Sequence, residues 1–319
     1  MTHSPHLAPS EPRADRSTGL APAGDAPVTP DRMPEDVGDP RHIIDILLEE
    51  RCQSMQQDFL WPLYKAILYP LLRHGEAVKM ADAIHPLTAW QAFSYLSDVL
   101  SLTLTTHGLE HVPRTGRLII ASTHPTGIAD GIAMFDALKT VRPDMAVYAN
   151  RDAVRAAPRF SDMIIPVEWL AEKRTRQRSR ETLVATRAAF DEGRCLVIFP
   201  SGRLAYMNDD RVLTEQDWMT SVVSLARKYE CDVVPVHMAA RNSWLYYWFR
   251  NLGPELRDIT LFNELLNKKR KPFTLTFDKP IAHTDLSGDP ERLTQALRAH
   301  AVDHIPAGVP WTRPAMLAR

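Results

Sequence analysis

From Gly108 onward, short apolar runs of β-type residues alternate with segments of helical periodicity. The apolar runs are Leu118 to Ser122, Ala146 to Ala149, Met163 to Val167, Cys195 to Phe199, Val233 to Met238 and Phe273 to Phe277. The helical patterns are Asp130 to Thr140, Arg180 to Glu192, Glu215 to Tyr229, Phe262 to Lys269 and Pro290 to His304. Near-continuous apolar strands separated by helices are typical of parallel sheets that are buried on both faces. The pattern predicts an α/β fold with a mostly parallel central sheet covered by helices.

Segments of different composition flank this region. Residues 1–40 contain 8 of the 25 prolines and predict a disordered tail, because they offer too little apolar area to offset the entropy of ordering. Residues 41–107 are predicted to be helical. Within them, Phe59 to Leu72 mixes aromatics with prolines and fits either a membrane interface or helices packed on the main domain. The α/β domain is predicted over 108–285, followed by a C-terminal helix and tail over 286–319.

Composition excludes several classes of protein. Among the 319 residues, 38 Lys and Arg balance 39 Asp and Glu, so the chain has no net positive field for nucleic acid. The longest apolar runs are too short to span a bilayer, and the N-terminus lacks the basic-then-apolar order of a secretory signal. Cys52, Cys195 and Cys231 cannot form a complete disulfide framework, which favours a reducing compartment. We expect a cytoplasmic protein.

Two apolar runs end in residues that can carry chemistry, at the strand ends where sites form in such sheets. The first continues as Ser122-Thr-His-Pro-Thr-Gly-Ile-Ala-Asp-Gly131, with His124 on the loop and Asp130 in the first helical turns. In this arrangement a carboxylate can hold one imidazole nitrogen while the other nitrogen faces substrate. The alternative is a helix-capping aspartate beside an unrelated histidine. The second run ends in Phe199-Pro-Ser-Gly-Arg203, a polar turn followed by a cation.

Together with Val233-Val-Pro-Val-His237, these segments resemble the glycerophospholipid acyltransferase family, which includes 1-acyl-sn-glycerol-3-phosphate acyltransferases. The family's first motif has His and Asp usually four residues apart, whereas His124 and Asp130 have five residues between them. That spacing and the sequence His-Pro-Thr-Gly resemble the corresponding motif of the bacterial hemolysin-like subgroup. The similarity extends to Ala240-Arg-Asn-Ser243 and to Glu264-Leu-Leu-Asn-Lys268.

Two motifs depart from the family pattern. The third motif normally reads Phe-Pro-Glu-Gly-Thr-Arg, but here Ser201 stands where the glutamate would be and Arg203 comes one place early. The second motif, usually a phenylalanine-containing turn that leads to an arginine, is replaced by Met163 to Glu168 and the basic run Lys173 to Arg180. Which of these cations serves that motif stays open.

The resemblance implies transfer of an acyl chain from acyl-CoA or acyl-carrier protein to the hydroxyl of a lysophospholipid or similar lyso-lipid, without a bound cofactor or metal. His124 is then the general base, oriented by Asp130. Thr126, Gly127, Ser201 and Gly202 are expected to contact substrate, with backbone N–H groups near Gly127 or in the Ser201-Gly202 turn as oxyanion donors. Arg203 is expected to hold a phosphate or headgroup. The expected partners are the thioester donor, the lyso-lipid and the inner membrane surface.

Three further features each allow two interpretations. The runs Lys173 to Arg180 and Lys268 to Lys271 fit solvated helix faces or contacts with anionic lipid. The stretch Trp244 to Phe249 fits core packing, an acyl-chain channel or contact with a bilayer. His237 is expected to be a core histidine.

Other enzyme classes lack their minimum motifs. Pro200-Ser201-Gly202 lacks the first glycine of a nucleophile elbow, and neither a zinc-type Cys/His spacing nor a phosphate loop occurs. The rival hypothesis is a lipid-binding or scaffold protein that keeps the fold without turnover, and the altered third motif favours it.

Overall fold

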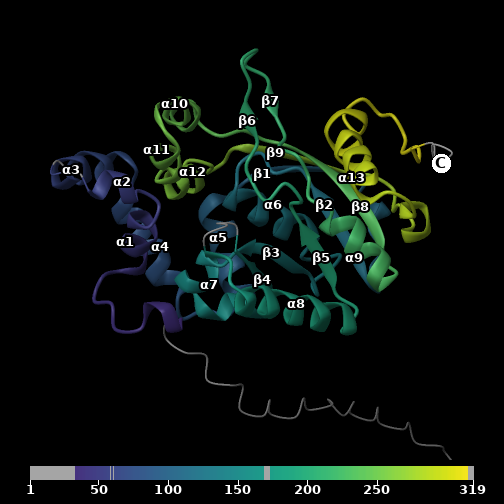
Figure 1. Ribbon diagram of the computed structural model, residues 1–319, viewed down its shortest axis with the longest axis horizontal. Coiled ribbons are helices and arrows are strands. Elements are labelled where there is room, and N and C mark those ends of the chain that lie inside the picture. Colours follow the sequence, from purple (N-terminus) through teal and green to yellow (C-terminus); the bar gives the residue numbers. More distant parts are fainter. Residues whose placement is uncertain (1–32, 58, 60, 169–172, 315–319) are drawn as a thin grey trace, which may run out of the picture. The chain divides into compact units, whose positions relative to one another are not determined.

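A sheet of seven strands forms the centre of the computed structural model, which describes residues 33–57, 59, 61–168 and 173–314 (Figure 1). The strands lie in the order β1-β9-β8-β2-β5-β3-β4. Their bounds are β1 (Thr103–His107), β2 (Leu118–Ser122), β3 (Ala146–Asn150), β4 (Ile164–Val167), β5 (Cys195–Ile198), β8 (Asp232–Ala239) and β9 (Pro272–Phe277). Neighbouring strands pair in parallel, except that β8 and β9 are antiparallel. The predicted α/β class with a mostly parallel sheet is confirmed.

Strand β1 and a small hairpin are not predicted by the apolar runs. The β1 strand lies at the sheet edge beside β9, and its residues alternate between exposed and half-buried. An edge strand of this kind carries polar residues, so it does not appear as a continuous apolar run. The hairpin of β6 (Tyr206–Met207) and β7 (Leu213–Thr214) stands apart from the main sheet (Figure 1).

The two faces of the sheet are covered by different helices. Along β2, Leu118 and Ile120 pack into one hydrophobic cluster, whereas Ile119 and Ala121 pack into the other. The first face is covered by α4 (His74–Ile84), α5 (Ala89–Leu100), α6 (Ile128–Leu138) and α12 (Leu261–Leu266). The second is covered by α8 (Arg176–Asp191), α9 (Ser221–Tyr229) and α13 (Pro290–Ala299), with a π-helical turn at His300–His304. Burial on both faces explains the continuous apolar runs.

The N-terminal region is helical as far as Leu100. Besides α4 and α5 it contains α1 (Ile43–Glu49), α2 (Gln53–Gln56) and α3 (Trp61–Leu71). The helices α7 (Asp152–Ala156), α10 (Trp244–Leu252) and α11 (Pro254–Asp258) complete the structure, together with short 3-10 turns at Pro34–Asp36, Leu109–His111, Pro158–Asp162 and His283–Leu286. No helix in the described ranges is long and apolar enough to cross a membrane.

Ordered structure begins before Arg41, which is earlier than the composition predicts. Residues 1–32 of the predicted tail lie outside the described residues. The 3-10 turn at Pro34–Asp36 is described, and the buried carboxylate of Asp36 pairs with the guanidinium of Arg155 at 2.7 Å. This ion pair gives a proline-rich segment a fixed position that its few apolar side chains do not provide.

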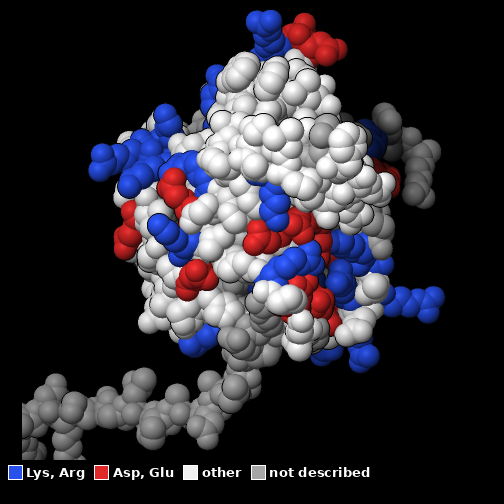
Figure 2. Space-filling view, turned by 90° about the vertical axis from the view of Figure 1, so that its left-hand side faces the viewer, with Lys and Arg blue, Asp and Glu red and all other residues white. Residues whose placement is uncertain are grey.

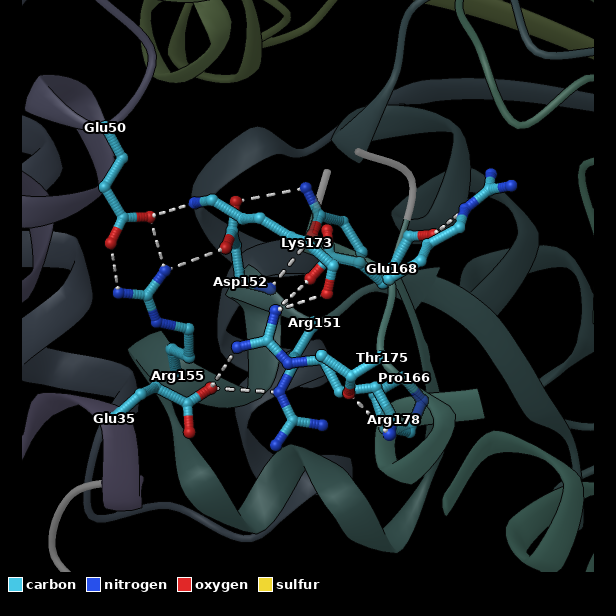
Figure 3. A network of polar contacts seen from close by, with 12 residues as sticks. Glu35, Glu50, Arg151, Asp152, Arg155, Pro166, Glu168, Lys173, Thr175 and Arg178 are labelled. Atoms are coloured by element: carbon cyan, nitrogen blue, oxygen red, sulfur yellow. Dashed lines mark hydrogen bonds and ion pairs between the residues drawn. The ribbon is translucent and has the colours of Figure 1, made fainter. Parts of the chain in front are cut away.

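Arg155, the partner of Asp36, belongs to a network of charges that includes Glu50 and Lys173 (Figure 3). Arg155 on α7 also pairs with Glu50 at 2.7 Å, and Lys173 reaches the same Glu50 carboxylate at 2.8 Å. Burial alone would raise the pKa of Glu50, but its hydrogen bonds with Arg155 and Lys173 lower it to about 2. The ionised form of Glu50 is therefore stabilised by folding.

We expect Glu50→Gln to lower the free energy of unfolding at pH 7 by about 2 kcal/mol, because the folded state holds the carboxylate in its charged form. Because the pKa of Glu50 is lower in the folded than in the unfolded protein, its ionisation stabilises the folded state at pH values above the unfolded pKa, near 4.5. This contribution is lost as the pH falls toward 2. Urea denaturation at pH 7, 5 and 3 measures the difference between variant and wild type. The difference in free energy of unfolding between Glu50→Gln and wild type should become smaller as the pH falls. The control Glu192→Gln, at an exposed site, should unfold with nearly the wild-type free energy at every pH. A Glu50→Gln difference that stays constant down to pH 3 would contradict this account.

Candidate active site

The two polar turns predicted from the sequence lie at the carboxyl ends of neighbouring strands. β2, which leads to His124, pairs in parallel with β5, which leads to Ser201. The connection from β2 passes through α6 to β3 on one side, and that from β5 passes through α9 to β8 on the other. Adjacent strands whose connections diverge in this way leave a crevice at their carboxyl ends, where ligands bind in open α/β sheets.

Asp130 holds the His124 loop and the start of α6 at the same time. Its Oδ2 lies 2.9 Å from His124 Nδ1 and accepts the backbone N–H groups of Thr126 and Gly127 at 2.8 and 3.0 Å. The Thr126 hydroxyl donates to the other carboxylate oxygen. The Asp130 side chain is 0% exposed, so these donors replace its hydration. Asp130 therefore caps the start of α6 and also contacts the imidazole, so His124 is not an unrelated histidine beside a capping aspartate.

The remaining contacts of His124 leave Nε2 as the ring atom available to substrate. The imidazole stacks on Phe199, with 4.3 Å between ring centroids, and its side chain is 16% exposed. The backbone carbonyl of His124 accepts the N–H of Ala205 at 2.9 Å. An Nδ1–H that donates to Asp130 fixes the tautomer in which Nε2 accepts a proton. This is the arrangement that a general base requires.

Direct contact joins the two turns. Gly127 has φ of +98°, and a Cβ there would lie 3.0 Å from the side chain of Leu204. The Gly202 and Arg203 residues are exposed, whereas Ser201 is buried and its hydroxyl donates to the Arg203 carbonyl at 2.8 Å. The second turn therefore presents Arg203 to solvent, whereas Ser201 is buried within the protein.

The backbone N–H groups proposed as oxyanion donors are partly engaged elsewhere. Those of Thr126 and Gly127 point at Asp130, and that of Gly202 donates to the Phe199 carbonyl at 2.9 Å. The expectation of an oxyanion site at the Gly127 N–H is wrong for this structure, because the same groups are needed to neutralise the buried carboxylate.

Glu215 is the residue of the site that sequence reasoning missed. The periodicity predicts a helix from Glu215 onward, but α9 begins at Ser221. Instead the Glu215 carboxylate turns back to His124 and accepts its backbone N–H at 3.0 Å. The serine at position 201, where the family motif has glutamate, is the one sequence signal for a carboxylate from another segment, and it does not identify that segment.

The basic runs are not simply solvated faces. Lys173 and Arg178 pair with Glu50 and Glu168. Lys268 is buried against Glu264 at 3.0 Å, so the interpretation of that lysine as part of a solvated face is wrong. Such internal pairing offsets the cost of removing a cation from water.

Two other expectations concern single elements. In α10, Tyr246, Tyr247 and Phe249 are buried while Trp244 and Trp248 are exposed, so the aromatic stretch both packs and faces outward. His237 donates from Nδ1 to the Ala301 carbonyl at 2.9 Å, and burial lowers its pKa, as suits a core histidine.

In the ranges the structure covers, no group of three or more His, Cys, Asp or Glu side chains is placed to hold a metal ion.

Comparison with known proteins gives consistent results. Residues 103–239 match the Acyltransferase family. A protein from Bacteroides thetaiotaomicron, named lyso-glycine lipid O-acyltransferase, is 25% identical over 190 residues, which are 58% of this chain and 68% of that protein. A protein of the same name from Phocaeicola vulgatus is 28% identical over 180 residues, which are 54% of this chain and 62% of that protein.

Among solved structures, the 1-acyl-sn-glycerophosphate (LPA) acyltransferase from Thermotoga maritima superposes with a TM-score of 0.44 and 13% identity, over 84% of this chain and 99% of that one. The family match covers β1 to β8, and hence both turns of the candidate site. Residues 103–239 therefore resemble an acyltransferase domain, and this part of the chain is similar to proteins named as O-acyltransferases.

Proposed function

We propose that this protein transfers a fatty acyl chain from a coenzyme A or acyl-carrier-protein thioester to the hydroxyl of a lyso-lipid during membrane lipid biosynthesis. The observation that carries the proposal is the 2.9 Å contact between His124 Nδ1 and Asp130 at the end of β2, inside the matched domain. Nε2 of His124 takes the proton of the acceptor hydroxyl as its oxygen attacks the thioester carbonyl. The thiolate then leaves and recovers that proton, so the step needs no acyl-enzyme.

The acceptor class draws on the relatives. Both curated proteins are named lyso-glycine lipid O-acyltransferase, which supports a lyso-lipid with an amino-acid headgroup as the acceptor. The His124-Pro-Thr-Gly and Ala240-Arg-Asn-Ser243 sequences support membership of the hemolysin-like subgroup. Lipid extraction and mass spectrometry of a deletion strain would name the acceptor through the lyso species that accumulates.

The other predicted site residues divide by exposure. Thr126, Gly127 and Ser201 are buried, so we propose that they shape the crevice through its backbone. Gly202 and Arg203 are exposed, and we propose that they contact a headgroup or phosphate. A guanidinium suits this task because it binds phosphate and carboxylate in a bidentate manner.

We expect His124→Ala to lower kcat by about 10²- to 10⁴-fold, the usual effect of losing a general base. Transfer of a radiolabelled acyl chain to the acceptor that the wild type uses measures the loss, with folding checked by circular dichroism. The matched control is His107→Ala, at an exposed position of β1, which should keep wild-type activity. Activity of His124→Ala within a factor of two of wild type would exclude the mechanism, and no transfer by the wild type with any thioester and acceptor pair would favour the scaffold hypothesis.

A second expectation concerns Arg203. No ion pair joins it to Asp209 or Asp210 in the part of the chain described, which leaves its guanidinium available to an anion. Arg203→Ala should raise KM for either the donor or the acceptor by about tenfold, and Arg203→Lys should recover only part of the loss because a point charge makes no bidentate contact. KM measured for each substrate separately identifies the one that is held. Arg187→Ala on α8 is the control, and an unchanged KM for both substrates would refute the role.

A membrane surface is the second partner that we propose, together with peripheral association at the inner face. On α3 and just before it, Phe59, Leu63, Ile67 and Leu71 recur every fourth residue and are exposed, Phe59 to 88%. On α10, Trp244 is 72% exposed and stacks on the exposed Trp248. Figure 2 shows the face that carries the N-terminal helices, where a broad uncharged area is bordered by charged side chains of both signs, Lys and Arg among them. Apolar stripes with aromatic residues and flanking cations suit a lipid interface.

We expect Ile67→Glu combined with Trp244→Glu to weaken binding to anionic vesicles at least tenfold, since each change places a charge in an apolar contact. Both sites are exposed, so folding should be unaffected. Co-sedimentation with phosphatidylglycerol vesicles at low and high salt measures the change, and high salt should release part of the wild type. Leu183→Glu, an exposed position on α8, is the matched control. Equal binding of the double variant and the wild type would contradict this interface.

A further inference from the structure

The side chain of Glu215 reaches the candidate site from the segment that follows β7. It is 5% exposed, and its two carboxylate oxygens accept different donors. Oε2 accepts the backbone N–H of His124 at 3.0 Å, and Oε1 accepts the indole N–H of Trp218 at 3.2 Å. The Ser201 hydroxyl is a further contact and lowers the pKa of this carboxyl. Glu215 therefore joins the two turns of the site, beside the residue that stands where the family motif has glutamate.

Glu215 acts on the same residue as Asp130, but from the opposite side. Asp130 holds the imidazole of His124 through Nδ1, whereas Glu215 holds its backbone through the N–H. The Ala205 N–H donates to the His124 carbonyl, and the Phe199 ring supports the imidazole face. A loop residue with ring, N–H and carbonyl all engaged has little freedom to move, which is the condition for an aligned general base.

Stability does not explain the burial of the Glu215 carboxyl group. Burial raises its pKa above the usual range, although hydrogen bonds with His124, Ser201 and Trp218 oppose the shift. A raised folded pKa means that the ionised carboxylate is less favourable in the folded than in the unfolded protein, so its stability contribution falls as pH rises through that pKa. Glu50 shows the opposite behaviour, since folding favours its charge. A buried carboxyl group with a perturbed pKa, hydrogen-bonded to a residue of the candidate site, is typical of a functional position.

We propose that Glu215 is a positioning residue for acyl transfer: its carboxylate clamps the backbone N–H of His124 and thereby fixes the direction of Nε2. The proposal rests on the role of His124 as the general base. It predicts that Glu215 affects kcat through His124, and that KM for donor and acceptor stays unchanged, because Glu215 is buried behind the loop and does not meet either substrate.

The test uses the two hydrogen bonds that Glu215 accepts, from the His124 N–H and the Trp218 indole N–H. In Glu215→Gln the amide carbonyl can accept only one of these hydrogen bonds, because the amide NH₂ is itself a donor and faces the other N–H. The clamp on His124 is therefore weakened. Trp218→Phe removes the competing indole N–H. Combined with Glu215→Gln, it lets the glutamine carbonyl accept the His124 N–H again. We expect kcat to fall 10- to 100-fold in Glu215→Gln, to change less than threefold in Trp218→Phe, and to recover at least fivefold in the double variant relative to Glu215→Gln. KM for each substrate should stay within twofold throughout.

Glu50→Gln is the matched control. It should lower the free energy of unfolding while leaving kcat unchanged, which separates stability from activity. A kcat of Glu215→Gln within twofold of wild type would overturn the proposal. So would a double variant that is no more active than Glu215→Gln, because a merely structural role predicts no rescue.

A second readout does not depend on turnover. In protein with ¹⁵N-labelled histidine, the His124 amide is identified by its loss in His124→Ala. The hydrogen bond to a carboxylate should shift the amide proton downfield in the wild type. That shift should decrease in Glu215→Gln and return in the double variant. An amide that is unchanged by Glu215→Gln would overturn the clamp, whereas a clamp seen in this spectrum without acyl transfer by the wild type would instead count against the proposed function.

Discussion

The buried carboxylate of Asp130 is the interaction on which the rest of the site depends. Removing a charge from water is costly unless donors replace the hydration. Here the donors are the N–H groups of Thr126 and Gly127, the Thr126 hydroxyl and the imidazole of His124. Because the helix start and the histidine share one acceptor, the loop conformation and the imidazole orientation cannot vary independently.

The sheet provides the other half of the site. Parallel pairing of β2 with β5 and with β8 brings three carboxyl ends to one edge, so residues far apart in the chain become neighbours. Divergent connections at β2 and β5 keep helices away from the space between the two turns. The hairpin β6–β7 then carries the chain from Arg203 out and back, and returns it at Glu215 beside His124.

Charge has two different uses in this fold. Glu50, Arg155 and Asp36 form ion pairs that favour folding and attach the N-terminal segment. Glu215 is buried in the candidate site, where its two carboxyl oxygens accept the backbone N–H of His124 and the indole N–H of Trp218. The first arrangement contributes stability, and the second connects separate segments of the candidate site.

Local pattern was sufficient for much of this protein. Continuous apolar runs identified six strands, since burial on both faces leaves no room for polar residues. The spacing of His124 and Asp130 within one turn-and-helix segment allowed a contact between the two side chains, which lie 2.9 Å apart. The edge strand β1, the exposure of half of α10 and the pairing of Asp36 with Arg155 were not accessible in this way. Glu215 is the clearest case: its contact with His124 spans 91 residues and exists only because parallel strands and a returning hairpin bring the two together. Sequence determines which residues can be buried and which can react, whereas long-range contacts follow from chain topology, which only the tertiary structure decides.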